Sequence, residues 1–540
     1  RAMSLDQLET LLPLVKGELK EYVQATDELR IELNDTNRPD LWCVEGIARQ
    51  MRGGQRPAHP ARQPSARSTL RIRVASDLKD IRPYIGACVA RGMAVTQTLL
   101  TQFIQTQEKL ADLFGRRRQT VSIGLYPLGK IEFPVSYTTA APDEARFVPL
   151  GAETPMTLRE ILAGHPKGKA YGSILSGAAR YPLLVDRRGE ILSFPPIINS
   201  QALGAVAVGD DEVLVEVTGT DQRMVHLAVN IWAANLTDRG ARVEPVAIEY
   251  EWTTPAGRRV ITPRDLSRPV SVPSSLIERV LGERMTPTES TRWLVSYGHR
   301  VTRSGSTLRV TPPPYRDDVL HPIDVVEDVA IARGYAAFDP VMPTQFTVGS
   351  LTPLERYADR VRELLVGFGF QETMANILTS REDVIGRMGH PEDLPGLVEV
   401  DNPMSESFAV LRPTLLASLL RVEGASSKAS YPHKIFELGE TAVVDDGTCR
   451  TELRAGALLA HASAAFSDAH AILESLAYAM GFSYRLEPVA HPSFIEGRAG
   501  SIIIDERPRG TIGEVSPAVL ERWGIGMPCA VFDLALDGLV

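Results

Sequence analysis

The chain has 540 residues, and its 58 Lys and Arg against 67 Asp and Glu give a formal net charge of −9. The length predicts several domains, and the composition, 44% hydrophobic and 23% charged, excludes a disordered or collagen-like chain. The acidic balance argues against a protein that coats nucleic acid non-specifically. No apolar run approaches the roughly 18 residues of a membrane span, so we expect no membrane association.

The four cysteines are scattered and form no CxxC pair. This spacing predicts reduced thiols, a cytoplasmic location and no zinc site built from cysteine. The N-terminal stretch RAMSLDQLET contains no apolar core of a signal peptide.

Residues 1–68 are predicted to form an N-terminal domain and a linker. The apolar pattern predicts two helices and one strand, over residues 4–19, 44–51 and 29–33. The linker, residues 53–68, carries prolines and three arginines but no acid, which is typical of a tether. Arg56, Arg62 and Arg67 either keep this tether solvated or make a local contact with RNA.

Residues 69–262 are predicted to form a mixed α+β domain. Short β-branched runs predict strands, and longer periodic runs predict helices between some of them. The order shows no regular βαβ repeat. The predicted strands cover residues 70–74, 85–89, 121–125, 183–185 and 213–217, and the predicted helices cover 98–113 and 222–236.

Residues 263–340 are predicted to form a small winged-helix-like domain. Ser275 with Glu278, and Thr286 with Glu289, have the spacing of capping boxes and predict the starts of two helices. Gly282 is placed to close the first helix. Two strands and a third helix are predicted over residues 300–302, 307–311 and 324–333.

Residues 341–540 are predicted to form an antiparallel sheet flanked by helices. An amphipathic helix over residues 353–367 opens this region. Candidate strands cover residues 397–400, 434–438, 455–459, 501–504 and 530–536.

Several nucleotide-binding and hydrolytic motifs are missing from the sequence. It contains no GxxxxGK[ST] loop, no GxGxxG turn that opens a helix, no HExxH and no GxSxG. Nucleotide binding through a P-loop or a Rossmann fold is therefore not expected.

An acidic cluster lies in the small domain: Asp317, Asp318, Asp324, Glu327 and Asp328. On a helix the last three share one face, where like charges repel unless a cation or arginines offset them. Oxygen ligands suit Mg²⁺ or Ca²⁺ rather than Zn²⁺. The alternative is a solvated helix N-terminus that the helix dipole favours.

Arg116, Arg117 and Arg118 follow Gly115 at the end of a predicted helix. Adjacent arginines could bind RNA phosphate or an acidic partner surface. The alternative is that they interact with the C-terminal end of the helix dipole.

Glu216 is an acid inside a β-branched run, VLVEVTGT. Alternation along a strand puts Glu216 and Thr218 on the same face. This face is either exposed to water or part of a pocket that recognises a hydroxyl group.

Taken together, the motifs resemble the β subunits of phenylalanine–tRNA ligases of the archaeal and eukaryotic type. The likeness is carried by an ordered set of segments that spans nearly the whole chain. These are IELNDTNRPDLWCVEGI (31–47), RPYIGACV (82–89), YPLLVDRRGEILSFPPIINS (181–200), VTGTDQ (217–222), PYRDDVLHPIDVVED (314–328), DNPMSESFAVLRPTLLASLL (401–420) and residues 491–500 and 512–520.

The resemblance implies a heterotetramer of two α and two β subunits. The α subunit would bind ATP and phenylalanine at a class II site and charge tRNA(Phe). This chain would then carry no catalytic residue for aminoacylation, and residues 341–540 would be a class II synthetase-like scaffold without activity. Arg412 falls in a structural motif of the family and is not expected to bind ATP.

The resemblance also implies that residues 69–262 form an editing domain. A hydrophobic pocket for phenylalanine rejects tyrosine poorly, because tyrosine only adds a hydroxyl group, so a second site would hydrolyse Tyr-tRNA(Phe). Glu216 matches the position that reads the hydroxyl, and Leu184, Ser193 and Thr218 match pocket positions. Two alternatives are a scaffold subunit with a decayed editing pocket and a free-standing RNA-binding module.

The chain departs from the family pattern at two places in this domain. The archaeal pattern favours Asp where Glu216 stands. Family members often carry a His-Asp pair where this chain has Tyr126-Pro127.

The resemblance assigns the acidic cluster to Mg²⁺. Asp318, Asp324, Glu327 and Asp328 match the metal positions of the family, and Asp317 falls outside the pattern. The metal would be structural and not catalytic.

Overall fold

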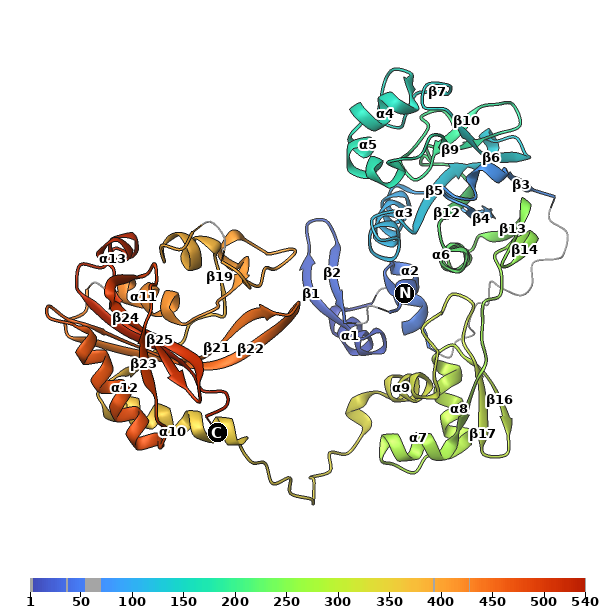
Figure 1. The fold of residues 1–540 in the computed structure, drawn as a ribbon. Helices are drawn as coiled ribbons and strands as arrows, with labels where there is room; N and C mark the ends of the chain where they lie inside the picture. Colours follow the sequence, from blue (N-terminus) through green and yellow to red (C-terminus); the bar gives the residue numbers. More distant parts are fainter. Residues whose placement is uncertain (1–2, 35–36, 54–68, 392–393, 427, 540) are drawn as a thin grey trace. The chain divides into compact units, whose positions relative to one another are not determined.

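The computed structural model describes residues 3–34, 37–53, 69–391, 394–426 and 428–539 (Figure 1). The chain divides into two compact units, residues 1–341 and 342–540. Both units mix helices and strands, which confirms the predicted α+β class. The division of the first unit into three domains stays a prediction. Arg56, Arg62 and Arg67 of the predicted tether lie outside the described residues.

The N-terminal part has a shorter first helix than predicted. The helix expected over residues 4–19 is wrong beyond residue 15, because Lys16 adopts the left-handed conformation (φ 49°) and turns the chain into a strand. This strand pairs antiparallel with the next one. The elements are α1 (Leu5–Leu11), η1 (Leu12–Val15), β1 (Gly17–Val23), β2 (Glu28–Leu33), η2 (Pro39–Leu41) and α2 (Val44–Met51).

Most of the described strands of residues 69–262 form one large sheet, and the short strands Arg146–Phe147 and Met156–Thr157 pair separately. The order of the large sheet is β11-β10-β9-β6-β3-β13-β4-β12-β5, with β14 paired to β13. β3 runs parallel to β6 and β13, and the other neighbours are antiparallel. The bounds are β3 (Arg71–Val74), β4 (Tyr84–Arg91), β5 (Val121–Pro127), β6 (Val135–Ala140), β9 (Tyr181–Val185), β10 (Ile191–Phe194), β11 (Ile198–Asn199), β12 (Glu212–Gly219), β13 (Arg242–Thr254) and β14 (Gly257–Thr262).

Helices α3 and α6 share a core with β4, β5 and β12 (Figure 1). In that core the rings of Phe103 and Trp232 meet edge to face, with centroids 5.5 Å apart. A second group of helices packs its apolar residues against β9 and β10. The bounds are η3 (Ser76–Leu78), α3 (Gln97–Lys109), η4 (Leu110–Phe114), η5 (Leu128–Lys130), β7 (Arg146–Phe147), β8 (Met156–Thr157), α4 (Leu158–Gly164), α5 (Pro166–Tyr171), η6 (Gly172–Leu175) and α6 (Gln222–Asp238).

The remainder of the first unit packs helices on a small sheet of order β15-β17-β16. The Thr286–Glu289 capping box is confirmed. The capping box predicted for Ser275 and Glu278 is wrong: α7 begins at Ser274 directly after β15, and its N-cap is Pro273. The elements are β15 (Val270–Pro273), α7 (Ser274–Leu281), α8 (Pro287–Ser296), β16 (Arg300–Ser304), β17 (Thr307–Thr311), α9 (Pro322–Arg333) and η7 (Tyr335–Ala337).

The second unit is built on a sheet of order β18-β21-β22-β26-β25-β24-β23. The sheet is antiparallel except for the edge pair β18 and β21. The helices α10 and α12 join one hydrophobic cluster, and α11 and α13 join another. Along β22, Ala457 and Leu459 belong to the first cluster and Leu458 to the second, so the two clusters lie on opposite faces of the sheet.

The strand predicted over residues 397–400 is wrong, because Glu399 there makes only a single bridge with Val410. The bounds in this unit are α10 (Pro353–Gly367), β18 (Gln371–Glu372), β19 (Leu378–Thr379), η8 (Glu382–Gly386), η9 (Glu406–Phe408), β20 (Val410–Leu411), α11 (Leu416–Ala425), β21 (His433–Asp445), β22 (Thr448–Ala460), α12 (Phe466–Met480), β23 (Arg485–Pro488), β24 (Phe494–Ile504), β25 (Arg507–Val515), α13 (Pro517–Trp523) and β26 (Cys529–Ala535).

Within the part of the chain that the structure describes, no helix combines the length and the apolar character needed to cross a membrane.

Candidate functional site

Glu216 lies in the interior of the large sheet. It is on β12, which pairs with β4 on one side and β5 on the other, opposite Ala87 and Gly124. Its side chain is 2% exposed. The alternative that Glu216 faces water is therefore wrong, and the carboxyl needs hydrogen-bond donors from inside the protein.

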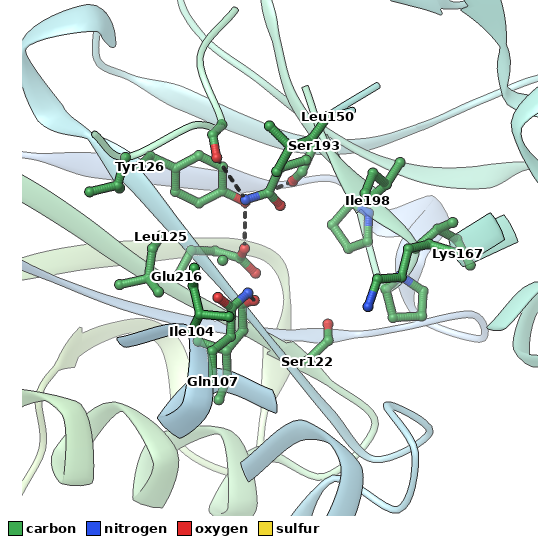
Figure 2. Close-up of a pocket in the computed structure, with 18 of the residues that line it drawn as sticks. Ile104, Gln107, Ser122, Leu125, Tyr126, Leu150, Lys167, Ser193, Ile198 and Glu216 are labelled. Carbon is green, nitrogen blue, oxygen red and sulfur yellow. Dashed lines mark hydrogen bonds between the residues drawn. The ribbon is translucent and has the colours of Figure 1, made fainter. Parts of the chain in front are cut away.

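A cavity of about 290 Å³ lies beside this carboxyl (Figure 2). This volume is close to the lower end of small-molecule pockets, roughly 300 Å³. The walls come from α3, β5 and the segment that joins β10 to β11, and most of them are apolar. Apolar wall residues include Leu100, Phe103, Ile104, Leu125, Leu150 and Ile198.

Tyr126 connects Glu216 to Ser193 in a buried hydrogen-bond chain (Figure 2). The phenol oxygen of Tyr126 lies 2.9 Å from Glu216 Oε2 and 2.9 Å from Ser193 Oγ. A phenol has one proton to donate. The arrangement that satisfies all three groups has Ser193 donating to Tyr126, and Tyr126 donating to the ionised Glu216.

The second carboxylate oxygen of Glu216 is the unusual atom of the site. Oε1 is buried and has no hydrogen-bond partner among the described residues. An unpaired buried acceptor costs about 1–3 kcal/mol. Glu216 is also one of the residues that line the cavity.

Burial raises the pKa of Glu216 to about 7. The Tyr126 hydrogen bond, the Arg82 charge and Thr218 oppose this rise. Burial and the charge of Glu216 together raise the pKa of Tyr126 well above its usual value, so its proton stays on the phenol. The carboxyl thus titrates near neutral pH while its neighbour remains a donor.

Thr218 and Leu184 stand behind the cavity and not in its wall. Thr218 Oγ1 lies 2.9 Å from Ser122 Oγ and accepts from Arg82 Nε at 3.1 Å. Leu184 is fully buried on β9, opposite Ser193. Of the four predicted pocket residues, the structure brings Ser193 and Glu216 to the cavity.

Sequence reasoning missed other polar residues of the wall, Tyr126, Gln107, Ser122 and Lys167. Gln107 donates to the Ile123 carbonyl at 2.6 Å. Lys167 forms an ion pair of 3.0 Å with Glu108. Of these residues, only Tyr126 had a signal in the sequence, because it stands where family members often carry a His-Asp pair.

The three adjacent arginines do not form one basic patch. Each has a positive φ, of 49°, 53° and 65°, in the turn after η4. Arg118 is held by the protein: its guanidinium lies 4.2 Å from the Tyr171 ring centroid and donates to the Ile197 carbonyl at 3.0 Å. Arg116 and Arg117 are exposed, and RNA binding by the three arginines stays a prediction.

Two of the acids assigned to Mg²⁺ are paired with Arg316 in the interior. Arg316 donates to Asp328 at 2.8 Å and to Asp318 Oδ1 at 3.1 Å. His299 Nε2 lies 2.7 Å from Asp328 Oδ2. The Arg316 charge, against the effect of burial, holds the pKa of both carboxyls below the usual range.

The other two acids have separate partners. Asp324 Oδ2 accepts from the backbone N–H groups of Leu320 and His321, at 2.8 and 2.7 Å. Glu327 pairs with Lys16 at 2.7 Å. Over the described ranges no three His, Cys, Asp or Glu side chains form a group that could hold a metal ion. The four acids therefore do not fit one shared site, because Arg316 already neutralises two of them.

Comparisons with known proteins agree across the chain. Two family models match: "tRNA synthetase B5 domain" over residues 270–335 and "Phenylalanyl tRNA synthetase beta chain CLM domain" over residues 339–536.

Curated relatives span nearly the full length. The phenylalanine–tRNA ligase beta subunit of Treponema pallidum is 39% identical, over 95% of this chain and 87% of the relative. Those of Borrelia hermsii and Thermococcus kodakarensis are 36% and 37% identical, over 99% and 100% of this chain and 96% of each relative.

A solved structure shares the fold over part of the chain. It is an N-terminal fragment of the phenylalanyl-tRNA synthetase beta subunit from Pyrococcus horikoshii. The TM-score is 0.58 at 35% sequence identity, and the match covers 62% of this chain and 96% of the fragment.

Proposed function

The chain belongs to the family of phenylalanine–tRNA ligase β subunits, and from this premise we propose that it joins an α subunit in ATP-dependent charging of tRNA(Phe) with phenylalanine. It is thus a subunit of an aminoacyl-tRNA ligase, a protein of translation. The complex is expected to be an α₂β₂ heterotetramer in the cytoplasm, with ATP and phenylalanine bound by the α subunit.

The second unit supports a scaffold role. Arg412 is buried and donates to Glu437 at 2.6 Å, to Ser418 at 3.1 Å and to the Glu440 carbonyl at 3.0 Å. Its guanidinium is thereby engaged inside the protein. A nucleotide phosphate would have to displace these contacts, so ATP binding belongs with the partner.

We further propose that the first unit hydrolyses mischarged Tyr-tRNA(Phe). The observation that carries this proposal is the buried, unpartnered Glu216 Oε1 at the apolar cavity. A tyrosyl phenol would donate to Oε1, whereas a phenylalanyl ring would leave this oxygen unpaired in an apolar enclosure. Sites that hydrogen-bond a substrate hydroxyl reject the analogue without it by about 10⁴–10⁵-fold.

The test is hydrolysis of Tyr-tRNA(Phe) and Phe-tRNA(Phe) by the α/β complex. Wild type should hydrolyse the tyrosyl ester selectively, and Glu216→Ala should lose roughly 10²-fold or more of that rate, since the contact that reads the hydroxyl is gone. Thr218→Ala should weaken it less, by loosening Arg82 and Ser122. Glu212→Gln, on the same strand and paired with Arg91, is the matched control.

A scaffold subunit with a decayed pocket is the competing function. It is favoured by the Tyr126 phenol, which already occupies one oxygen of Glu216. If the wild-type complex hydrolyses no Tyr-tRNA(Phe), this alternative replaces editing. Isolation of the chain from its native cell without an α subunit would instead support a free-standing RNA-binding module.

We propose a Mg²⁺ site with two carboxylate ligands in place of the four expected from the sequence. Mg²⁺ keeps several waters and is often bound through only one or two carboxylates. Asp324 and Glu327 are the acids outside the Arg316 cluster, so they would hold the ion, and it would link the first turn of α9 to the second. Asp318 and Asp328 would act through Arg316 and not as ligands.

A further inference from the structure

The Tyr126 phenol fits into the site because Gly124, on the same strand, has no side chain. Gly124 and Tyr126 lie two residues apart on β5 and therefore on one face of the strand. A Cβ atom at Gly124 would lie 2.2 Å from the Tyr126 phenol oxygen and 2.7 Å from Glu216 Oε2. The phenol–carboxylate contact thus occupies the space that a side chain at Gly124 would fill.

Within the editing function proposed above, on which this inference rests, we propose that Tyr126 is a positioning residue for hydroxyl recognition. Its phenol takes Glu216 Oε2 and leaves Oε1 as the acceptor for one incoming hydroxyl group. Ser193 supports this contact: with the single phenolic proton on the bond to Glu216, the Ser193 hydroxyl, 2.9 Å away, is left to donate to the phenol oxygen.

This geometry also biases the protonation of the carboxyl. The site must present an ionised acceptor to a ligand O–H, and burial works against ionisation. The hydrogen bond from Tyr126 favours the ionised form. The other groups near Glu216 are the Arg82 cation, Tyr137 and Thr218. The cavity wall adds Arg118, Lys167 and Glu108, the last two of which pair with each other.

The charged neighbours do not replace the phenol. The Arg82 guanidinium donates its hydrogen bonds to the carbonyls of Arg118, Gln119 and Thr218 and to two hydroxyls. The Tyr137 hydroxyl donates to the Arg82 carbonyl at 3.0 Å. Tyr126 is the group whose O–H touches the Glu216 carboxyl among the described hydrogen bonds.

The first test compares wild-type and Tyr126→Phe α/β complexes in Tyr-tRNA(Phe) hydrolysis between pH 6 and 9. The variant should raise KM about tenfold with little change in kcat, because it weakens a contact present in both ground and transition states. Its half-maximal rate should move up by about one pH unit, since the ionised carboxyl loses a donor. Tyr250→Phe removes another buried phenol, bonded to the Ile85 carbonyl, and should change neither.

The second test does not depend on editing. Thermal midpoints of wild type, Tyr126→Phe, Glu216→Gln and the double variant form a cycle at each pH. Coupling between the two positions should appear above pH 7 and fade toward pH 5, where Glu216 is protonated. Coupling without hydrolysis would retain the positioning role and overturn editing. Hydrolysis with no coupling and an unshifted pH profile would overturn the positioning role.

Should Tyr126→Phe fail to fold, Ser193→Ala probes the same chain from its other end. It removes the donor that orients the phenol and should shift the pH profile in the same direction by a smaller amount. A rate loss at all pH values with no shift would overturn the inference.

Discussion

Two regions of the first unit bury acids, and they treat them in opposite ways. Around Arg316, the carboxylates of Asp318 and Asp328 are paired with guanidinium or imidazole groups. Beside the cavity, one oxygen of Glu216 accepts from a phenol and the other has no partner among the described residues. The first arrangement pairs the acids with cations of the same unit, and the second leaves one carboxylate oxygen as the acceptor that the proposed editing function would use.

The difference also appears in the pKa values. The Arg316 charge lowers the pKa of Asp328, whereas burial raises that of Glu216 to about 7. A buried acid that retains its ordinary pKa needs an opposing charge close by. Asp328 has such a charge in Arg316, at 2.8 Å, and the carboxyl of Glu216 has a phenol as its hydrogen-bond donor.

The largest expected effect comes from removing Arg316, the cation that pairs with both buried acids. Arg316→Leu leaves Asp318 and Asp328 buried without their main cation and should lower the free energy of unfolding by about 3–5 kcal/mol. Denaturant unfolding of the complex measures this. Arg303→Leu, at an exposed arginine of β16, should change it by less than about 1 kcal/mol. Equal losses in both variants would contradict the contrast.

The next effect is the pH dependence of stability that Glu216 causes. The folded pKa of Glu216, about 7, lies above the ordinary 4.5. Its contribution to stability is therefore fully present below pH 4.5 and is lost as the pH rises through 7. Glu216→Gln should remove a penalty on the order of 3 kcal/mol at pH 8 and little at pH 4.5. Thermal midpoints at the two pH values decide it, and a gain that is equal at both would refute the assignment.

A smaller effect is expected from filling the space at Gly124. Gly124→Ala should displace the Tyr126 phenol and lower the free energy of unfolding by about 1–3 kcal/mol, as overpacking does. Gly129→Ala is the matched control, because a Cβ atom there meets nothing within 4 Å. Unchanged stability in Gly124→Ala would show that the contact yields without cost.

The smallest effect concerns Mg²⁺. Asp324→Ala combined with Glu327→Ala should lower stability by about 1 kcal/mol more in millimolar Mg²⁺ than in EDTA, the size given by an ion at several times its Kd. Melting curves with and without the ion measure this. A loss of the same size in EDTA would assign both acids to capping and to the Lys16 pair alone.

The sequence predicted the local features of the site and missed its long-range ones. Alternation along β12 placed Glu216 and Thr218 on one face, and only the pairing partners show that this face is buried. Tyr126 could not be found in this way. Its contact with Glu216 joins residues 90 positions apart and depends on the register of β5 against β12, which no local pattern encodes.

The fold shows the same limit. Helices with strong periodicity, such as α2 and α10, end where the pattern predicted. The capping box at Ser275 failed because a strand that was not predicted, β15, runs straight into α7. The helix predicted over residues 4–19 is wrong beyond residue 15 because Lys16 adopts a left-handed conformation, which a lysine does not predict.

The missing side chain at Gly124 constrains how this pocket can change over generations. Gly124, Tyr126 and Glu216 share one volume, so they are epistatic: a substitution tolerated at one depends on the state of the other two. A larger residue at 124 requires the phenol or the carboxyl to move or to be replaced by a shorter group. Homologous pockets should therefore exchange these three residues in a preferred order, with position 124 changing last.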